Sequence, residues 1–338
     1  MVGFADTPAG PVPRVATKLS RHDWLGTVRA RMGIARSGYK VNPGLYCVGS
    51  AGPDSPVLVT ANYKLSFDAL RRELSGLAAW ILVADTRGIN VWCAAGKGTF
   101  CADEIALQTL RTRLEQIVSH RELILPQFGA TGVAARELKK KCGFAGIFGP
   151  LRAADIPRFL HNDRQADEAM RAVTFTLAER LVLVSVEISL AWKLLALATG
   201  MIFLLSGIGP HIFSPVAAWH RGLAATGATL LAVLAGALIT PLLLPWLPGR
   251  QFWLKGAQAG GMAGLLSLFL AGNPWSLAGA GLWLWTVAGA SYLAMNFTGA
   301  TPYTSLSGVE KEMRRGLPFQ LAATTAALAL WLAASFLG

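Results

Sequence analysis

The sequence has few residues that bind metals. Its 338 residues include only five histidines, which are scattered, and four cysteines: Cys47, Cys93, Cys101 and Cys142. Structural zinc sites and iron–sulfur clusters need closely spaced thiolates, such as Cys-x-x-Cys pairs, and these cysteines form none. We therefore expect no zinc site, histidine metal site or iron–sulfur cluster of the chain's own.

Nucleotide-binding motifs are also missing. No Gly-x-Gly-x-x-Gly follows an apolar run. The stretch at 96–99 only partly resembles a phosphate-binding loop, because Gly98 follows Lys97 where Ser or Thr is needed. The formal net charge of +12 suits an anionic membrane surface or ligand. Without interleaved aromatic and basic residues it does not indicate nucleic acid.

Charge is nearly absent from the second half. Residues 1–185 hold 24 of the 31 Lys and Arg and 16 of the 19 Asp and Glu. Beyond them lie five apolar segments, in which Lys193 is the only charge, near one end: 190–208, 223–247, 256–272, 275–297 and 317–337. Helices of this length cross a bilayer core of about 30 Å. We predict five transmembrane helices in contact with lipid.

Loop charges predict the orientation. With the first half in the cytoplasm, only Arg221 lies in the opposite loops. The cytoplasmic side then carries Arg250, Lys255, Lys311, Arg314 and Arg315. This distribution follows the positive-inside rule. We expect a multi-pass protein of the cytoplasmic (inner) membrane with a cytoplasmic N-terminal domain, and no signal peptide, since residues 1–22 contain no apolar run.

The first half alternates short apolar runs with helical patterns. We expect strands at 57–60, 80–84, 122–126 and 144–148, and helices at 67–79, after Asn90, at 103–120 and at 133–141. This alternation predicts a Rossmann-like α/β domain with a parallel sheet and ligands at the carboxyl ends of the strands. The expected division is a domain over 1–165, a linker over 166–188 and an all-α membrane domain over 189–338.

Cys93 is the strongest candidate for chemistry. It follows the 80–84 run, where a strand turns into a helix that Asn90 is suited to cap. The positive end of the helix and nearby Lys97 both favour the thiolate, which binds soft metals. The alternative is a buried structural thiol.

Three segments carry a family resemblance: 88–100, with Asn-Val-Trp-Cys-Ala-Ala-Gly-Lys at 90–97, then 125–135 and 149–157. They resemble the corrinoid domain of the corrinoid iron–sulfur protein large subunit. A soluble domain followed by five apolar helices is similar to the mercury-methylating corrinoid (HgcA) family. The resemblance covers about 40–160 in motif and the whole chain in architecture.

This resemblance implies a corrinoid cofactor, with Cys93 on a cap helix as the lower axial ligand of its cobalt. Small residues in that helix would let it lie close under the macrocycle, whereas Trp92 is as readily a core residue as a stacking one. The implied binding set is Thr60, Asn90, Val91, Trp92, Cys93, Ala94, Ala95, Gly96, Lys97, Gln127, Gly129, Ala130, Thr131, Gly132, Gly149 and Pro150.

The activity implied is methyl transfer from a methylated corrinoid to inorganic Hg(II), giving methylmercury. A methyl-folate methyltransferase would supply the methyl group. A ferredoxin-like iron–sulfur protein would supply electrons, since the chain lacks cluster cysteines. One alternative is a membrane-bound corrinoid methyl carrier of acetyl-CoA metabolism. Another is a transporter or sensor whose soluble domain only binds a corrinoid; the lack of internal repeats and of paired intramembrane charges argues against it.

Overall fold

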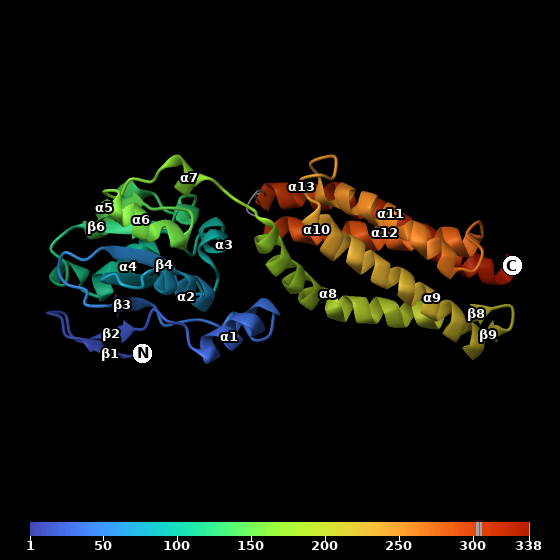
Figure 1. Cartoon of the computed structure of the whole chain (residues 1–338), viewed down its shortest axis with the longest axis horizontal. Coiled ribbons are helices and arrows are strands. Elements are labelled where there is room, and N and C mark those ends of the chain that lie inside the picture. The colour runs from blue at the N-terminus through green and yellow to red at the C-terminus, as the bar shows by residue number, and fades with distance from the viewer. Residues whose placement is uncertain (302–303, 305, 338) are drawn as a thin grey trace. The chain divides into compact units, whose positions relative to one another are not determined.

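The computed structural model describes residues 1–301, 304 and 306–337, and divides into two compact units (Figure 1). Unit 1 comprises Met1–Val173 and unit 2 comprises Thr174–Gly338. Unit 1 mixes strands and helices, whereas unit 2 consists almost entirely of helices. This agrees with the α/β domain and the following helical domain expected from the sequence.

Unit 1 is built on a seven-stranded sheet with the order β1-β2-β3-β5-β4-β6-β7. The strands are β1 Gly3–Ala5, β2 Val12–Val15, β3 Gly44–Val48, β4 Val57–Ala61, β5 Ala79–Ala84, β6 Glu122–Leu125 and β7 Ala145–Phe148. The four strands expected from the sequence are β4 to β7. Within this group, each pair of neighbouring strands is parallel.

The prediction of a wholly parallel sheet is wrong. Strand β3 runs antiparallel to β5, and β1 runs antiparallel to β2, so the sheet is mixed. These three strands contain or border prolines and glycines, such as Pro13 and Gly44. Without a long alternating pattern, nothing in the local sequence distinguishes them from loops.

Helices cover both faces of this sheet. They are α1 Arg21–Arg31, α2 Lys64–Glu73, α3 Val91–Gly96, α4 Ala102–Arg111, α5 Ala135–Cys142, α6 Ile156–His161 and α7 Glu168–Arg171, with short 3-10 turns η1 Arg36–Gly38, η2 Leu114–Gln116, η3 Gln127–Gly129 and η4 Ala153–Asp155. Strands β4 and β5 are buried along their whole length, with one apolar cluster around Trp80 and Phe100 and another around Phe67 and Phe159.

The helix expected over 103–120 is shorter than predicted. It ends at Arg111, and Arg113 adopts a left-handed conformation with φ of 49°. The Thr112 hydroxyl donates to the carbonyl of Gln108 at 2.8 Å, which stabilises the end of the helix. The turn that follows brings Leu114 and Val118 into the core, which explains why the apolar pattern continued beyond the helix.

Unit 2 contains long helices joined by short turns (Figure 1). They are α8 Leu177–Leu205, α9 Pro215–Val233, a π-helical turn η5 Leu234–Ile239, α10 Thr240–Leu242, α11 Phe252–Leu270, α12 Leu277–Phe297, η6 Thr298–Ala300 and α13 Leu306–Leu337. A small hairpin of β8 Ile208–Gly209 and β9 Ile212–Phe213 joins α8 to α9.

Among the described residues, four helices are long and apolar enough to cross a membrane: Leu177–Leu205, Pro215–Leu242, Leu277–Ala300 and Ser307–Leu337. The fifth predicted span falls on α11, which is not one of them. Helix α11 contains Lys255, Gln258 and several glycines, which are polar or only weakly apolar. The count of five membrane spans is therefore not confirmed.

The first long helix begins earlier than the sequence suggested. The expected linker over 166–188 overlaps α8, which starts at Leu177, and the division between units falls after Val173. Thr176 and Glu179 form a capping box, in which each side chain accepts a hydrogen bond from the other residue's backbone N–H. Glu179 and Arg180, which fall within the expected linker, belong to the first turn of this helix.

Candidate functional site

Cys93 lies in the first turn of α3, and Asn90 fixes that turn. The Asn90 side chain accepts a hydrogen bond from the backbone N–H of Cys93 at 2.9 Å, as the sequence predicted for an N-cap. Ala94 and Ala95 are buried, whereas Cys93 is only half-buried. The helix therefore packs through its alanines and leaves the thiol accessible.

The segment before α3 is held by one buried amide, that of Asn62. Its Oδ1 accepts the backbone N–H groups of Thr86 at 3.1 Å and Gly88 at 2.9 Å, and lies 2.9 Å from the Thr86 hydroxyl. Its Nδ2 donates to Asp85 at 2.8 Å. Asn62 follows β4 and this segment follows β5, so a single side chain joins the carboxyl ends of two neighbouring strands.

Gly88 is needed where this segment passes a second loop. Its φ of 77° lies in the left-handed region, and a Cβ added to it would lie 3.1 Å from the carbonyl oxygen of Ser37. A side chain would therefore be both strained and crowded. Glycine at this position lets the segment before α3 approach the loop over 33–37.

These segments enclose a cavity of about 570 Å³. It is lined by Gly33, Ala35, Arg36, Ser37, Tyr63, Arg87, Gly88, Ile89, Asn90 and Cys93. Cys93 is the only Cys, His, Asp or Glu in this lining. Among the described residues, no group of three or more such side chains is placed to hold a metal ion.

The cavity wall is positively charged. It carries Arg36 and Arg87 but no carboxylate, and the Arg36 guanidinium lies 5.9 Å from the ring centroid of Tyr63. Burial raises the pKa of the Tyr63 hydroxyl, and Arg36 only partly offsets this, so Tyr63 remains a neutral phenol. The wall favours a ligand with an anionic group.

Only two residues of the predicted binding set, Asn90 and Cys93, belong to the cavity lining. Thr60 is buried in β4, and Gly149 and Pro150 are buried after β7. The contacts of the other predicted residues with a corrinoid stay predictions.

The predicted segment 127–132 packs against the core side of α3. A Cβ added to Gly132 would lie 2.8 Å from the Cα of Ala95 and 2.5 Å from the carbonyl oxygen of Phe100. At Gly129 an added Cβ would lie 2.6 Å from the Phe100 ring. These glycines let the segment support the helix that presents Cys93.

Nothing in the sequence indicated that the loop over 33–37 forms one wall. It lies between α1 and β3 and contains left-handed Gly33 and Ala35, with no periodic pattern. Tyr63 follows β4 and the segment over 85–97 follows β5, so both lie at the carboxyl ends of parallel strands, where the sequence predicted ligands.

Residues 21–160 match the family described as CO dehydrogenase/acetyl-CoA synthase delta subunit. The matched segment holds the whole cavity lining.

Individual relatives agree with this match. The acetyl-CoA decarbonylase/synthase complex subunit gamma of Archaeoglobus fulgidus is 29% identical over 153 residues, which cover 43% of this chain and 32% of the relative. Subunit gamma 2 of Methanosarcina thermophila is 33% identical over 129 residues, covering 36% and 26%. The corrinoid/iron-sulfur protein large subunit of Moorella thermoacetica is 31% identical over 114 residues, covering 33% and 25%. The chain thus spans a third or less of each of these relatives.

Proposed function

We propose that unit 1 binds a corrinoid and that the chain uses it to transfer methyl groups. The observation that carries this proposal is Cys93, which is presented by a capped helix on the wall of a cavity of about 570 Å³. Support comes from the similarity of the surrounding segment to a corrinoid/iron-sulfur protein.

The residues at the cavity fit such a group. The thiol is half-buried, so it is both accessible and positioned. The cavity wall carries two arginines, Arg36 and Arg87, and no carboxylate. Arginine pairs well with phosphate, so this wall suits the phosphate of a corrinoid's nucleotide tail.

A bound corrinoid supplies a cobalt ion that can carry a methyl group. The Cys93 thiolate would hold this cobalt, and the hydrogen bond from the Cys93 N–H to Asn90 would fix the turn that carries the thiolate. A thiolate donates more electron density than an imidazole does, so a corrinoid held by it would supply methyl groups together with their bonding electrons to a soft electrophile.

We propose inorganic Hg(II) as that electrophile and methylmercury as the product. The support is the similarity of the chain's architecture to the HgcA family: a corrinoid-type domain followed by apolar helices, four of which suit a membrane. We place unit 1 in the cytoplasm and unit 2 in the cytoplasmic membrane, as the loop charges favour.

Electron counting requires a reductant. A methyl group from a methyl-folate methyltransferase arrives without its bonding electrons and leaves for Hg(II) with them, so two electrons must enter in each turnover. The described residues offer no metal-cluster site. We propose a ferredoxin-like iron–sulfur protein as the electron donor, drawn to the basic chain by charge.

A second candidate is a membrane-bound corrinoid methyl carrier of acetyl-CoA metabolism. The relatives favour it, since several are subunits of acetyl-CoA decarbonylase/synthase complexes. Both candidates need Cys93, and they differ in the methyl acceptor.

The test supplies the full chain with a corrinoid, the methyltransferase, methyl-folate, a ferredoxin and Hg(II), and measures methylmercury. We expect formation well above a reaction without the chain, and a fall to that background in Cys93→Ala. Cys101→Ala is the matched control, since Cys101 is also half-buried and its side chain makes no cap hydrogen bond. Corrinoid binding and methylation without methylmercury would instead support the acetyl-CoA carrier.

A further inference from the structure

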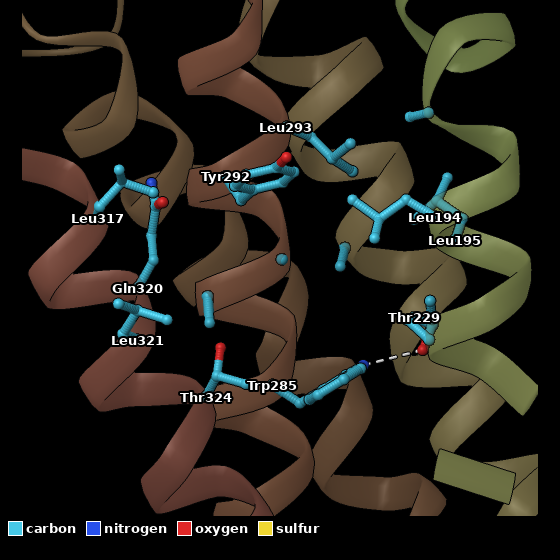
Figure 2. A pocket seen from close by; sticks show the side chains of 15 residues that line it. Leu194, Leu195, Thr229, Trp285, Tyr292, Leu293, Leu317, Gln320, Leu321 and Thr324 are labelled. Carbon is cyan, nitrogen blue, oxygen red and sulfur yellow. Dashed lines mark hydrogen bonds between the residues drawn. The ribbon is translucent and has the colours of Figure 1, made fainter. Parts of the chain in front are cut away.

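Unit 2 contains a second cavity, of about 310 Å³, between α8, α9, α12 and α13 (Figure 2). Its wall is mostly aliphatic, with Leu194 and Leu195 from α8 and Leu317 and Leu321 from α13. Trp285 from α12 adds an aromatic surface. All four helices belong to the candidate membrane spans, so an apolar molecule dissolved in a bilayer is a suitable occupant.

One polar side chain in this wall, Gln320 of α13, is not fully paired. Its exposed fraction is 5%, and its Nε2 donates to the Ser291 hydroxyl oxygen at 3.1 Å. Among the described residues, its buried Oε1 has no hydrogen-bond donor. A buried amide oxygen without a donor is uncommon and marks a position where a ligand can donate.

The orientation of this amide follows from the hydrogen bonds around it. The Ser291 hydroxyl donates to the carbonyl oxygen of Trp253 at 3.0 Å, so it can only accept from Gln320. The amide nitrogen must therefore face Ser291, which leaves the Gln320 oxygen to face elsewhere.

The other polar pair in the wall is satisfied. The Thr229 oxygen accepts from Trp285 Nε1 at 2.9 Å, the contact drawn in Figure 2, and donates to the carbonyl of Ala225 at 2.9 Å. Tyr292 and Thr324 add hydroxyl groups to the same wall. The cavity thus combines apolar walls with an acceptor that lacks a donor.

The position of Gln320 along its helix restricts the occupant. It lies one turn into the apolar segment 317–337, about 5 Å along the helix from Leu317 at ~1.5 Å per residue, and the charged residues of α13 all precede that segment. The amide therefore lies near one face of a hydrocarbon core about 30 Å thick. An amphiphile suits this position, because its hydroxyl group stays near the interface while its hydrocarbon chain extends into the core.

We propose that this cavity binds a membrane-soluble alcohol. Its hydroxyl group donates to Gln320 Oε1, and its hydrocarbon chain lies against the leucines of α8 and α13. The site is independent of the corrinoid cavity of unit 1 and does not require the methyl-transfer proposal to hold.

The test uses two photoreactive probes on the purified full chain in lipid nanodiscs: a diazirine-bearing decan-1-ol and the diazirine-bearing decane that lacks its hydroxyl. Peptide mapping by mass spectrometry measures labelling of the cavity wall. We expect the alcohol to label the wall about fivefold more than the alkane, the effect of one buried hydrogen bond. Unlabelled decan-1-ol should compete with the alcohol probe.

Two variants complete the test. Gln320→Met should reduce labelling by the alcohol to the level of the alkane and leave alkane labelling unchanged. Gln258→Met is the matched control, because Gln258 also has a buried, unpaired Oε1 but does not line the cavity. Equal labelling by the two probes in the wild-type chain would overturn the proposal and identify the cavity as space filled by lipid tails. An unaltered preference in Gln320→Met would overturn the role of its oxygen.

Discussion

The two units differ in the size of the side chains that they bury. Unit 1 fills its interior with large side chains, and Trp80, Phe100 and Phe144 are almost fully buried there. Unit 2 buries mainly small residues between its helices and turns many large apolar side chains outward; the exposed fraction of Phe269 in α11 is 70%. A core of large side chains is what water requires, whereas helices in lipid gain more from close approach through small residues.

The glycines of α11 show how close that approach is. A Cβ added to Gly256 would lie 2.4 Å from the Cβ of Ala294 and 2.6 Å from the carbonyl oxygen of Ala290. At Gly260 an added Cβ would lie 2.7 Å from the Cβ of Ala290. Helix α11 therefore lies directly against α12, which explains its place in the unit although it is not among the candidate membrane spans.

The largest effect is expected where this close packing is broken. Gly256→Val adds three carbons in space that α12 already fills, and we expect it to destabilise unit 2 by more than about 3 kcal/mol. Thermal unfolding of the full chain in detergent, followed by circular dichroism, should show a lower midpoint for the helical unit.

Gly261→Ala is the matched control on the same helix, since its added Cβ would have its nearest neighbour 4.0 Å away. It should leave the midpoint unchanged. Equal effects of the two variants would show that α11 does not depend on close contact with α12.

In unit 1 the most sensitive position is polar. Asn62→Ala removes the amide that joins the ends of β4 and β5, and leaves the N–H groups of Thr86 and Gly88 without their acceptor. We expect a loss of about 2–3 kcal/mol in the free energy of unfolding of unit 1, together with weaker corrinoid binding. Chemical denaturation and cofactor retention after gel filtration measure the two effects.

Asn42→Ala provides the comparison, because Asn42 is exposed and the substitution keeps its backbone oxygen, which accepts the hydroxyl of Tyr46. Normal cofactor retention in Asn62→Ala would argue that the segment before Cys93 keeps its conformation without this amide.

A smaller effect is expected from an ion-pair network between α1 and α2. Asp23 lies 2.6 Å from Lys64 Nζ and 3.0 Å from Arg71, and accepts the backbone N–H of Ser20. Burial alone would raise the pKa of Asp23, but the hydrogen bonds from Lys64 and Ser20 outweigh it and hold the pKa well below its ordinary value of 3.8.

Since the folded-state pKa of Asp23 is lowered, its contribution to stability is complete above the unfolded value and declines as the pH falls below about 4. We expect unit 1 to lose about 1 kcal/mol from this group in acid, and Asp23→Asn to remove that part of the pH dependence. Denaturation midpoints between pH 3 and 7 measure it; parallel pH profiles for wild type and Asp23→Asn would contradict the assignment.

The sequence predicted those parts of the fold whose signals are local. Strands β4 to β7 are continuous apolar runs, and Asn90 lies only three residues before Cys93. The strands and the capped helix could therefore be recognised from the sequence. The antiparallel strand β3 and the end of α4 depend on pairing and packing with distant segments. Apolar residues such as Leu114 look alike whether a helix or a turn brings them to the core.

The candidate site shows the same limit. One wall of the cavity follows from the strand ends, which place Tyr63 and Cys93 at one edge of the sheet. The opposite wall, with Arg36, comes from a loop whose position depends on the approach of Gly88 to Ser37. Such a contact between segments about fifty residues apart leaves no periodic pattern in either one.

The smallest effect is expected from separating the two units after Val173. Both apolar clusters of unit 1 consist entirely of its own residues, and Met170, close to the boundary, is buried in one of them. The carbonyl of Met170 also accepts the N–H of Leu151 at 3.0 Å, so the last helix of the unit is attached to the segment after β7.

A fragment of residues 1–173 should have a free energy of unfolding within about 0.5 kcal/mol of that of unit 1 in the full chain, because no core residue is removed. A fragment of 1–155 lacks Phe159 and Met170 and should be clearly less stable in the same guanidinium titration. Aggregation of 1–173, or equal stability of the two fragments, would show that the core of unit 1 is not complete in the way its buried residues indicate.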